Sequence, residues 1–188
     1  MAKKNANKEK MNEQMEIPSG VSVKMHHGVI TIEKGNENVM RKINSVLGVN
    51  VEGNKLVISA KKQGRKEKRI LGSFKAHIKN AFEGLNEKFK YKLQVATIHF
   101  PMTLTHDKNT NELVVKNFLG EKKDRRIKIE NGVDLKINKD IIELESSDIE
   151  KAGQTAANIE KGTKIRHRDR RIFQDGIFIT EKPGRIFL

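Results

Sequence analysis

The sequence lacks cysteine and tryptophan altogether and has a single tyrosine among its 188 residues. The absence of cysteine excludes disulfides, thiolate metal sites and a cysteine nucleophile, and it is compatible with a reducing compartment. A hydrophobic content of only 36% predicts small cores. No apolar run approaches the roughly 18 residues that a membrane span needs, and the first residues contain no apolar segment of signal-peptide length. We therefore expect a soluble intracellular protein.

Motifs of the main enzyme classes are missing as well. The chain contains no GxxxxGK, GxSxG, GxGxxG or HExxH pattern. An RNA-processing enzyme built on His99 and on His106 with Asp107 is one alternative, but these residues lie in separate segments and no residue is placed to orient a base. The histidines do not stand at zinc-ligand spacing with carboxylates; they are His26, His27, His77, His99, His106 and His167. We predict that the protein is not an enzyme and needs no cofactor or metal.

Positive charge is what the sequence has in excess. It contains 38 lysines and arginines against 24 aspartates and glutamates, a formal net charge of +14. Self-repulsion at this charge destabilises a compact chain unless an anion lies nearby. The candidate partners are nucleic acid, an acidic membrane surface and an acidic protein. The clustering of the charge, described below, favours nucleic acid.

Two parts of the chain repeat one pattern. Residues 49–58 read VNVEGNKLVI, and residues 133–142 read VDLKINKDII. The apolar pair at residues 29–30 precedes the pair at residues 113–114 by the same number of residues as separates these two runs. A helix-like segment follows each copy, and a glycine, an alanine and an isoleucine recur in it: Gly72, Ala76, Ile78 and Gly153, Ala157, Ile159. Three matched segments in the same order indicate an internal duplication.

Each copy is expected to contain hairpins and then one helix. Residues 22–34 alternate apolar and polar side chains around a His-Gly turn, and residues 49–59 do so around Gly53 and Asn54. Apolar side chains then recur every four residues from Ile70 to Phe82, which predicts an amphipathic helix. Glycine is unfavourable within a helix. Gly72 therefore either lies inside this helix at a cost in stability or marks the start of the helix.

The second copy carries its own helix signals. Ser147 and Glu150 have the spacing of a capping box. A thinner apolar stripe follows, and Gly162 stands where a C-cap belongs. The whole pattern predicts an α+β fold with two duplicated small domains, each an antiparallel-rich sheet with one helix packed on one face. We expect a mobile basic tail at 1–16, an N-terminal domain at 17–93 and a C-terminal domain at 94–188 that carries most of the nucleic-acid binding.

The densest arginine cluster lies near the end of the chain, in RHRDRRIFQDGIFITEK at residues 166–182. Guanidinium makes forked contacts to phosphate and stacks on bases, which favours binding over a merely solvated loop. The Asp175–Gly176 pair between apolar runs predicts a two-residue hairpin with Phe173 opposite Phe178. The hairpin would hold the arginines on a rigid element. Whether the two phenylalanines contact a base or the core stays open.

Two further basic runs are less specific. Residues 61–69 form a candidate secondary binding site or a solvated loop, with six basic side chains: Lys61, Lys62, Arg65, Lys66, Lys68 and Arg69. In residues 122–128, alternation places Arg126 and Lys128 on the solvent face of an ordinary strand, which we favour over binding.

Several segments resemble one known family. RRIFQDGIFITEK at 170–182, with Gln154 and Lys164 before it, is similar to the C-terminal signature of the universal large-subunit ribosomal protein six family, in its archaeal and eukaryotic branch. HFPMTL at 99–104 and NFLGEKKDRR at 117–126 resemble that branch too. Phe178 stands where the family often has tyrosine. The resemblance runs from about Ile17 to the end, and internal duplication is a mark of the family.

The resemblance implies a structural constituent of the large ribosomal subunit, cytoplasmic and ribosome-bound. Its C-terminal domain would dock on large-subunit ribosomal RNA near the sarcin–ricin region, beside neighbouring proteins of the stalk base, with no membrane contact and no homo-oligomer. Asp175 and Gly176 would shape a turn. The expected RNA-binding residues are Lys164, Arg166, His167, Arg168, Arg170 and Arg171, with Lys182 and Arg185 after them. The alternative is a free-standing architectural DNA- or RNA-binding protein.

Overall fold

The chain forms two compact units that divide between Asn86 and Glu87 in a computed structural model, which describes residues 12–62 and 64–187. The expected boundary between residues 93 and 94 falls inside one strand, β7 (Phe89–Ala96), which belongs wholly to the second unit. The division therefore lies earlier in the chain than the pattern of residues indicated.

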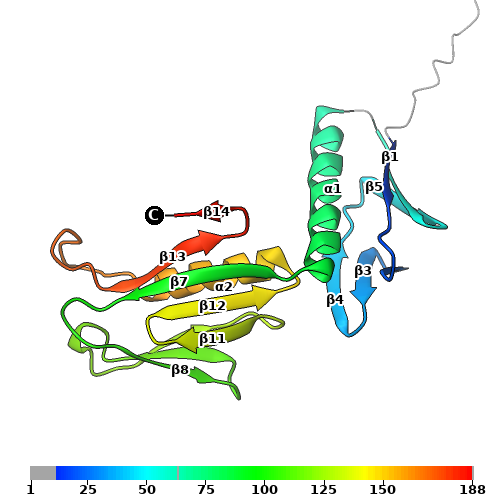
Figure 1. The fold of residues 1–188 in the computed structure, drawn as a ribbon. Helices are drawn as coiled ribbons and strands as arrows, with labels where there is room; N and C mark the ends of the chain where they lie inside the picture. The colour runs from blue at the N-terminus through cyan, green and yellow to red at the C-terminus, as the bar shows by residue number, and fades with distance from the viewer. Residues whose placement is uncertain (1–11, 63, 188) are drawn as a thin grey trace, which may run out of the picture. The chain divides into compact units, whose positions relative to one another are not determined.

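The described part of the first unit contains six strands and a helix (Figure 1). Two antiparallel sheets have the strand orders β1-β6-β5 and β2-β3-β4. The strands are β1 (Asn12–Glu16), β2 (Ser22–His26), β3 (Val29–Lys34), β4 (Glu37–Lys42), β5 (Leu47–Glu52) and β6 (Lys55–Ala60), and the helix is α1 (Arg65–Asn86). Both expected hairpins are confirmed. The first turns at His27 and Gly28, with φ of 45° and 75°, which is the left-handed geometry of tight hairpin turns.

Helix α1 buries the predicted stripe against both sheets of its unit. Phe74, Ile78 and Phe82 lie in one core with residues of β3 and β6, among them Ile30 and Ile58. Each such side chain, once buried, contributes about 1.5–3 kcal/mol to folding. The helix begins at Arg65, so Gly72 lies inside it and does not mark its start.

The second unit repeats this plan and extends it. Its sheets have the orders β11-β12-β7-β13-β14 and β10-β9-β8. Its elements are β7, β8 (Thr103–Asp107), β9 (Glu112–Lys116), the short 3₁₀ helix η1 (Phe118–Gly120), β10 (Arg125–Lys128), β11 (Asp134–Asn138), β12 (Ile141–Ser146), α2 (Ile149–Gly162), β13 (Gly176–Lys182) and β14 (Arg185–Ile186).

The strand pairing confirms the duplication. β6 lies between β1 and β5 in the first unit, and β12 lies between β7 and β11 in the second. The order of six strands and a helix also recurs. The α+β class is therefore confirmed, although the strands of each unit fall into two sheets instead of one. In the second unit, β13 and β14 extend the sheet on the far side of β7 (Figure 1).

The ends of α2 differ from the sequence prediction. The N-cap is Asp148, whose side chain accepts from the Glu150 backbone N–H at 3.0 Å, and not Ser147. The C-cap is Thr163, whose backbone N–H bonds to the Ile159 carbonyl. Gly162 is the last helical residue, and a Cβ added there would lie 2.6 Å from the Ile127 side chain. Gly162 therefore allows close packing of α2 on β10 and does not cap the helix.

The predicted basic tail is wrong in part. Residues 12–16 form β1, which pairs with β6 in the register Asn12↔Ser59 to Glu16↔Lys55. The rest of the predicted tail, residues 1–11, lies outside the described residues. Among the helices of the described ranges, neither is apolar over a length that would cross a membrane.

Candidate nucleic-acid interface

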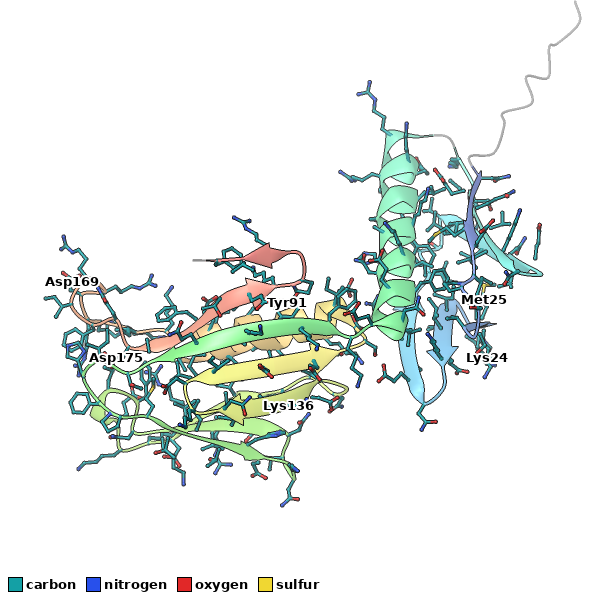
Figure 2. The ribbon with its side chains drawn as sticks, viewed as in Figure 1. Lys24, Met25, Tyr91, Lys136, Asp169 and Asp175 are labelled. Carbon is teal, nitrogen blue, oxygen red and sulfur yellow. The ribbon has the colours of Figure 1, made fainter. Side chains whose placement is uncertain are left out.

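The chain between α2 and β13, residues 163–175, carries the arginine cluster, and we call it the arginine loop. It extends beyond the end of the sheet, and Figure 2 shows Asp169 on its outer part and Asp175 near β13. The predicted hairpin at Asp175 and Gly176 is wrong. β13 begins at Gly176 and pairs with β7, so that Phe178 lies opposite Gln94 and not opposite Phe173. The long-range partner β7 has replaced the local strand that the Asp-Gly signal predicted.

Asp175 has a different role from the predicted one. Its side chain is 1% exposed. One carboxylate oxygen accepts the backbone N–H groups of Ile98 at 2.8 Å and His99 at 2.9 Å, and the other lies 2.6 Å from His99 Nδ1. Burial raises the pKa of the Asp175 carboxyl, but these hydrogen bonds outweigh it and hold the pKa below its usual value. Asp175 therefore ties the segment after β7 to the end of the arginine loop.

This contact also corrects the sequence analysis of His99. The sequence places no residue near His99 to orient the imidazole, yet Asp175 lies against it in the fold. The two residues are 76 positions apart, and no local pattern links them. His99 also contacts the ring of Phe173, with centroids 4.8 Å apart. His99 and Asp175 thus form part of the support of the loop. His106 lies on β8.

Arg125 on β10 holds the other end of the arginine loop. Its guanidinium donates to the carbonyl of Gly162 at 2.9 Å and to that of Lys164 at 3.3 Å. It lies over the ring of Phe118 and is paired with Glu121. Its hydrogen bond holds the pKa of Glu121 below the usual value. No local pattern in the sequence predicts this role of Arg125.

The remainder of β10 follows the prediction. Ile127 is buried, and its neighbours Arg126 and Lys128 are exposed. The alternation of this strand thus leaves two basic side chains on the solvent face, as expected. Arg126 lies 3.6 Å from Glu112 on β9.

Two further anchors order the arginine loop from within. Thr163 Oγ1 accepts a hydrogen bond from the Ile177 backbone N–H at 3.1 Å, which joins the end of α2 to the start of β13. Asp169 forms a turn: its backbone carbonyl accepts from Phe173 N–H at 2.9 Å, and its side chain accepts from Arg171 N–H at 2.9 Å. Ile165 is buried in the core of the unit. The loop is therefore anchored at both ends and across its middle.

The predicted cations of this loop are exposed. Arg171 pairs with Asp169 at 3.0 Å, and its hydrogen bonds lower the pKa of that carboxyl. Arg168 lies over the ring of Phe173, 4.8 Å from its centroid. Within the described ranges, Arg171 is the one loop arginine that forms an ion pair. The exposed members of the cluster are Lys164, Arg166, His167, Arg168, Arg170 and Arg171.

Lys182 and Arg185 lie away from this cluster. They flank the turn between β13 and β14, and both stack on Phe187, at 5.0 and 4.7 Å from its centroid. β13 has seven residues, so at about 3.3 Å per residue its two ends lie roughly 20 Å apart. The structure therefore places these two predicted site residues at the opposite end of the strand from the arginine loop (Figure 1).

The outer face of the five-stranded sheet carries charges that neutralise one another. Glu145 on β12 lies between two lysines, 3.3 Å from Lys136 and 3.6 Å from Lys90. Lys92 pairs with Glu181 at 2.7 Å. Figure 2 shows Lys136 on this sheet, apart from the arginine loop. Because opposite charges alternate here, this face presents little net field, and the positive potential of the unit is concentrated at the loop.

The second predicted run lies in the first unit. Lys61 and Lys62 precede α1, and Arg65, Lys66, Lys68 and Arg69 lie in its first turns, all six of them exposed. Glu67 is the one acid of the first turn. The N-terminus of a helix carries a partial positive charge, so cations there are unfavourable unless an anion is near.

A cleft adjoins the arginine loop. Its volume is about 690 Å³, and it lies between the end of α2, the loop and the first residues of β13. The described residues contain no group of three or more histidine, aspartate or glutamate side chains that would hold a metal ion.

These features define a class of protein: a duplicated α+β protein that presents an ordered and largely unpaired arginine surface at one end of its second unit. The family model described as "Ribosomal protein L6" matches residues 105–176, which include most of the second unit and the whole arginine loop.

Relatives match over most of the chain. "Large ribosomal subunit protein uL6" of Methanococcus vannielii is 37% identical over 177 residues, which cover 94% of this chain and 96% of the relative. The protein of the same name from Haloarcula marismortui is 39% identical over 173 residues, with 92% and 96% covered. The chain belongs to the ribosomal protein L6 family, and these similar members are archaeal. Membership in this structural family confirms the prediction that the protein is not an enzyme.

Proposed function

We propose that the protein is a structural constituent of the large ribosomal subunit and that the arginine loop is its main contact with large-subunit ribosomal RNA. The names of the matching relatives support the ribosomal role. The observation that carries the RNA contact is the loop itself: four arginines on an anchored segment, of which only Arg171 is ion-paired in the described ranges. A fixed array loses less entropy on binding than a floppy tail.

The proposed location is ribosome-bound in the cytoplasm, near the sarcin–ricin region and the stalk base, with neighbouring ribosomal proteins as further partners and no homo-oligomer. This location follows from the family resemblance. The basic residues at the start of α1 are a proposed secondary RNA contact, since an RNA phosphate there would offset both their mutual repulsion and the field of the helix N-terminus. Lys182 and Arg185 would touch RNA only at a site separate from the loop.

The test is a titration of the protein against large-subunit ribosomal RNA at several salt concentrations. Arg166→Ala with Arg170→Ala removes two exposed guanidiniums of the loop. Each lost phosphate contact lowers the slope of log K against log salt by about one unit. We expect a slope about two units smaller and binding roughly 10- to 100-fold weaker for each of the two lost contacts, since a hydrogen bond to a charged group contributes about 1.5–3 kcal/mol.

The matched control is Lys90→Ala with Lys136→Ala, which removes the same charge from the outer sheet face. This variant should keep most of the affinity and most of the salt slope. Equal losses in both variants would mean that net charge alone, and not the loop, carries the binding. In a sucrose gradient the wild-type protein should travel with large subunits. A protein that stays at the top would favour the free-standing architectural alternative.

A further inference from the structure

The cleft beside the arginine loop has features that phosphate binding alone does not require. Its volume of about 690 Å³ lies within the roughly 300–1,000 Å³ that is typical of sites for small molecules. Ile165 and Ile177 line it and are buried, and the rings of Phe173 and Phe178 form further parts of its wall. It is therefore an apolar hollow next to a surface of fixed cations.

Phe178 is the exposed aromatic side chain of this cleft. It remains 38% exposed, although it lies in a paired region of β13. Its ring lies back over Gly176, where an added Cβ would be 3.0 Å from Phe178 Cζ. Gly176 also has a φ of 157°, which other residues rarely adopt. The glycine thus makes room for a ring that lies along the strand with part of its surface toward solvent.

The charged residues that line the cleft are mostly cations. The exposed or half-exposed charged residues of the lining comprise one acid, Glu160, and four cations: Lys161, Lys164, Arg170 and Arg171. The other acid of the lining, Asp175, is buried, and its carboxylate is occupied by the His99 contacts. A ligand that fills this cleft should therefore join an apolar, flat part to an anionic part. An apolar peptide segment would leave the cations without a partner.

We propose that this cleft receives one unstacked nucleotide of ribosomal RNA, with its base against Phe178 and its phosphate at Arg170 and Lys164. The proposal rests on the proposed ribosomal function and adds a base contact to it. Every base has a face that stacks on an aromatic ring, and sequence-specific RNA recognition generally uses such splayed nucleotides. The phosphate would meet the guanidinium of Arg170, one of the three loop arginines without an ion pair in the described ranges.

The first experiment uses the full chain and two small probes. Adenosine 5′-monophosphate contains a base and a phosphate, and ribose 5-phosphate contains the phosphate alone. In NMR titrations, the base should shift the backbone amides of Ile177 and Phe178 by its ring current, and ribose 5-phosphate should not. Phe178→Ala should weaken adenosine 5′-monophosphate binding about ten-fold, as expected for the loss of one base stack. Identical shifts with both probes would overturn the proposal.

The second experiment uses archaeal large-subunit ribosomal RNA and dimethyl sulfate, which modifies accessible bases. We expect one base in the footprint to be protected by the wild-type protein and reactive with Phe178→Ala. Phe178→Tyr should restore the protection, which excludes a merely misfolded variant. The control is Ile172→Ala, since Ile172 is 63% exposed on the same loop and does not line the cleft.

The outcomes separate the two proposals. If Phe178→Ala binds the RNA with an unchanged base pattern while Arg166→Ala with Arg170→Ala binds weakly, the nucleotide cleft is refuted and the proposed function stands. If the arginine variant binds as well as the wild type, the proposed function fails. The adenosine 5′-monophosphate titration then decides the cleft by itself, because it needs no ribosomal RNA.

Discussion

At the residue scale, Asp175 is a buried side chain that fixes one end of the arginine loop. It holds both the backbone of residues 98–99 and the ring of His99. From the sequence, Asp175 is predicted to shape a turn. Its actual partners lie in a distant segment, so the position could be predicted from the sequence but the role could not.

Asp175→Asn should destabilise the second unit in a pH-dependent way. Folding lowers the pKa of this carboxyl. The contribution to stability is therefore fully present above the unfolded pKa of about 3.9 and is lost as the pH falls through the folded value. We expect the free energy of unfolding of the variant to be about 1–3 kcal/mol lower than that of the wild type at neutral pH. This difference should shrink below about pH 4. Urea denaturation at several pH values measures this. A pH-independent difference would contradict it.

At the element scale, the hairpins and α1 follow from local signals, and the structure confirms them. β1 and β13 do not. β1 has the sequence NEQME with an alternating exposed pattern, so a strand that forms only by pairing with β6 resembles a polar tail. β13 carries a strong local turn signal, but its backbone pairs with β7, about 80 residues earlier in the chain. Long-range pairing overrides local propensity in both cases.

The start of α1 allows a test of its proposed RNA contact. Lys66 and Lys68 are exposed near the positive end of the helix. Replacement of both by glutamate should stabilise the first unit by about 0.3–1 kcal/mol for each residue and weaken binding to large-subunit ribosomal RNA. Thermal unfolding and an RNA titration measure the two effects. The gain in stability should vanish in roughly 1 M salt, where screening is strong. Stabilisation without loss of RNA affinity would remove α1 from the interface.

At the scale of the whole molecule, the excess charge is sorted between faces. The chain carries +14, yet the outer face of the five-stranded sheet pairs its lysines with glutamates. The arginine loop pairs only one of its arginines within the described residues. Composition alone predicts a polyanion partner, and the local arginine cluster predicts that the arginine loop binds it, which stays a prediction. The contacts that anchor the arginine loop to β10 and to residues 98–99 could not be predicted from the sequence, because they join segments that only the fold brings together.

The most direct test of this account is a photo-crosslinking map on assembled large subunits. One photoreactive residue would replace Arg170 in the arginine loop, and in a second protein one would replace Lys136 on the outer sheet face. We expect crosslinks to large-subunit ribosomal RNA from position 170 and few or none from position 136. RNA crosslinks from position 136, with none from position 170, would contradict it.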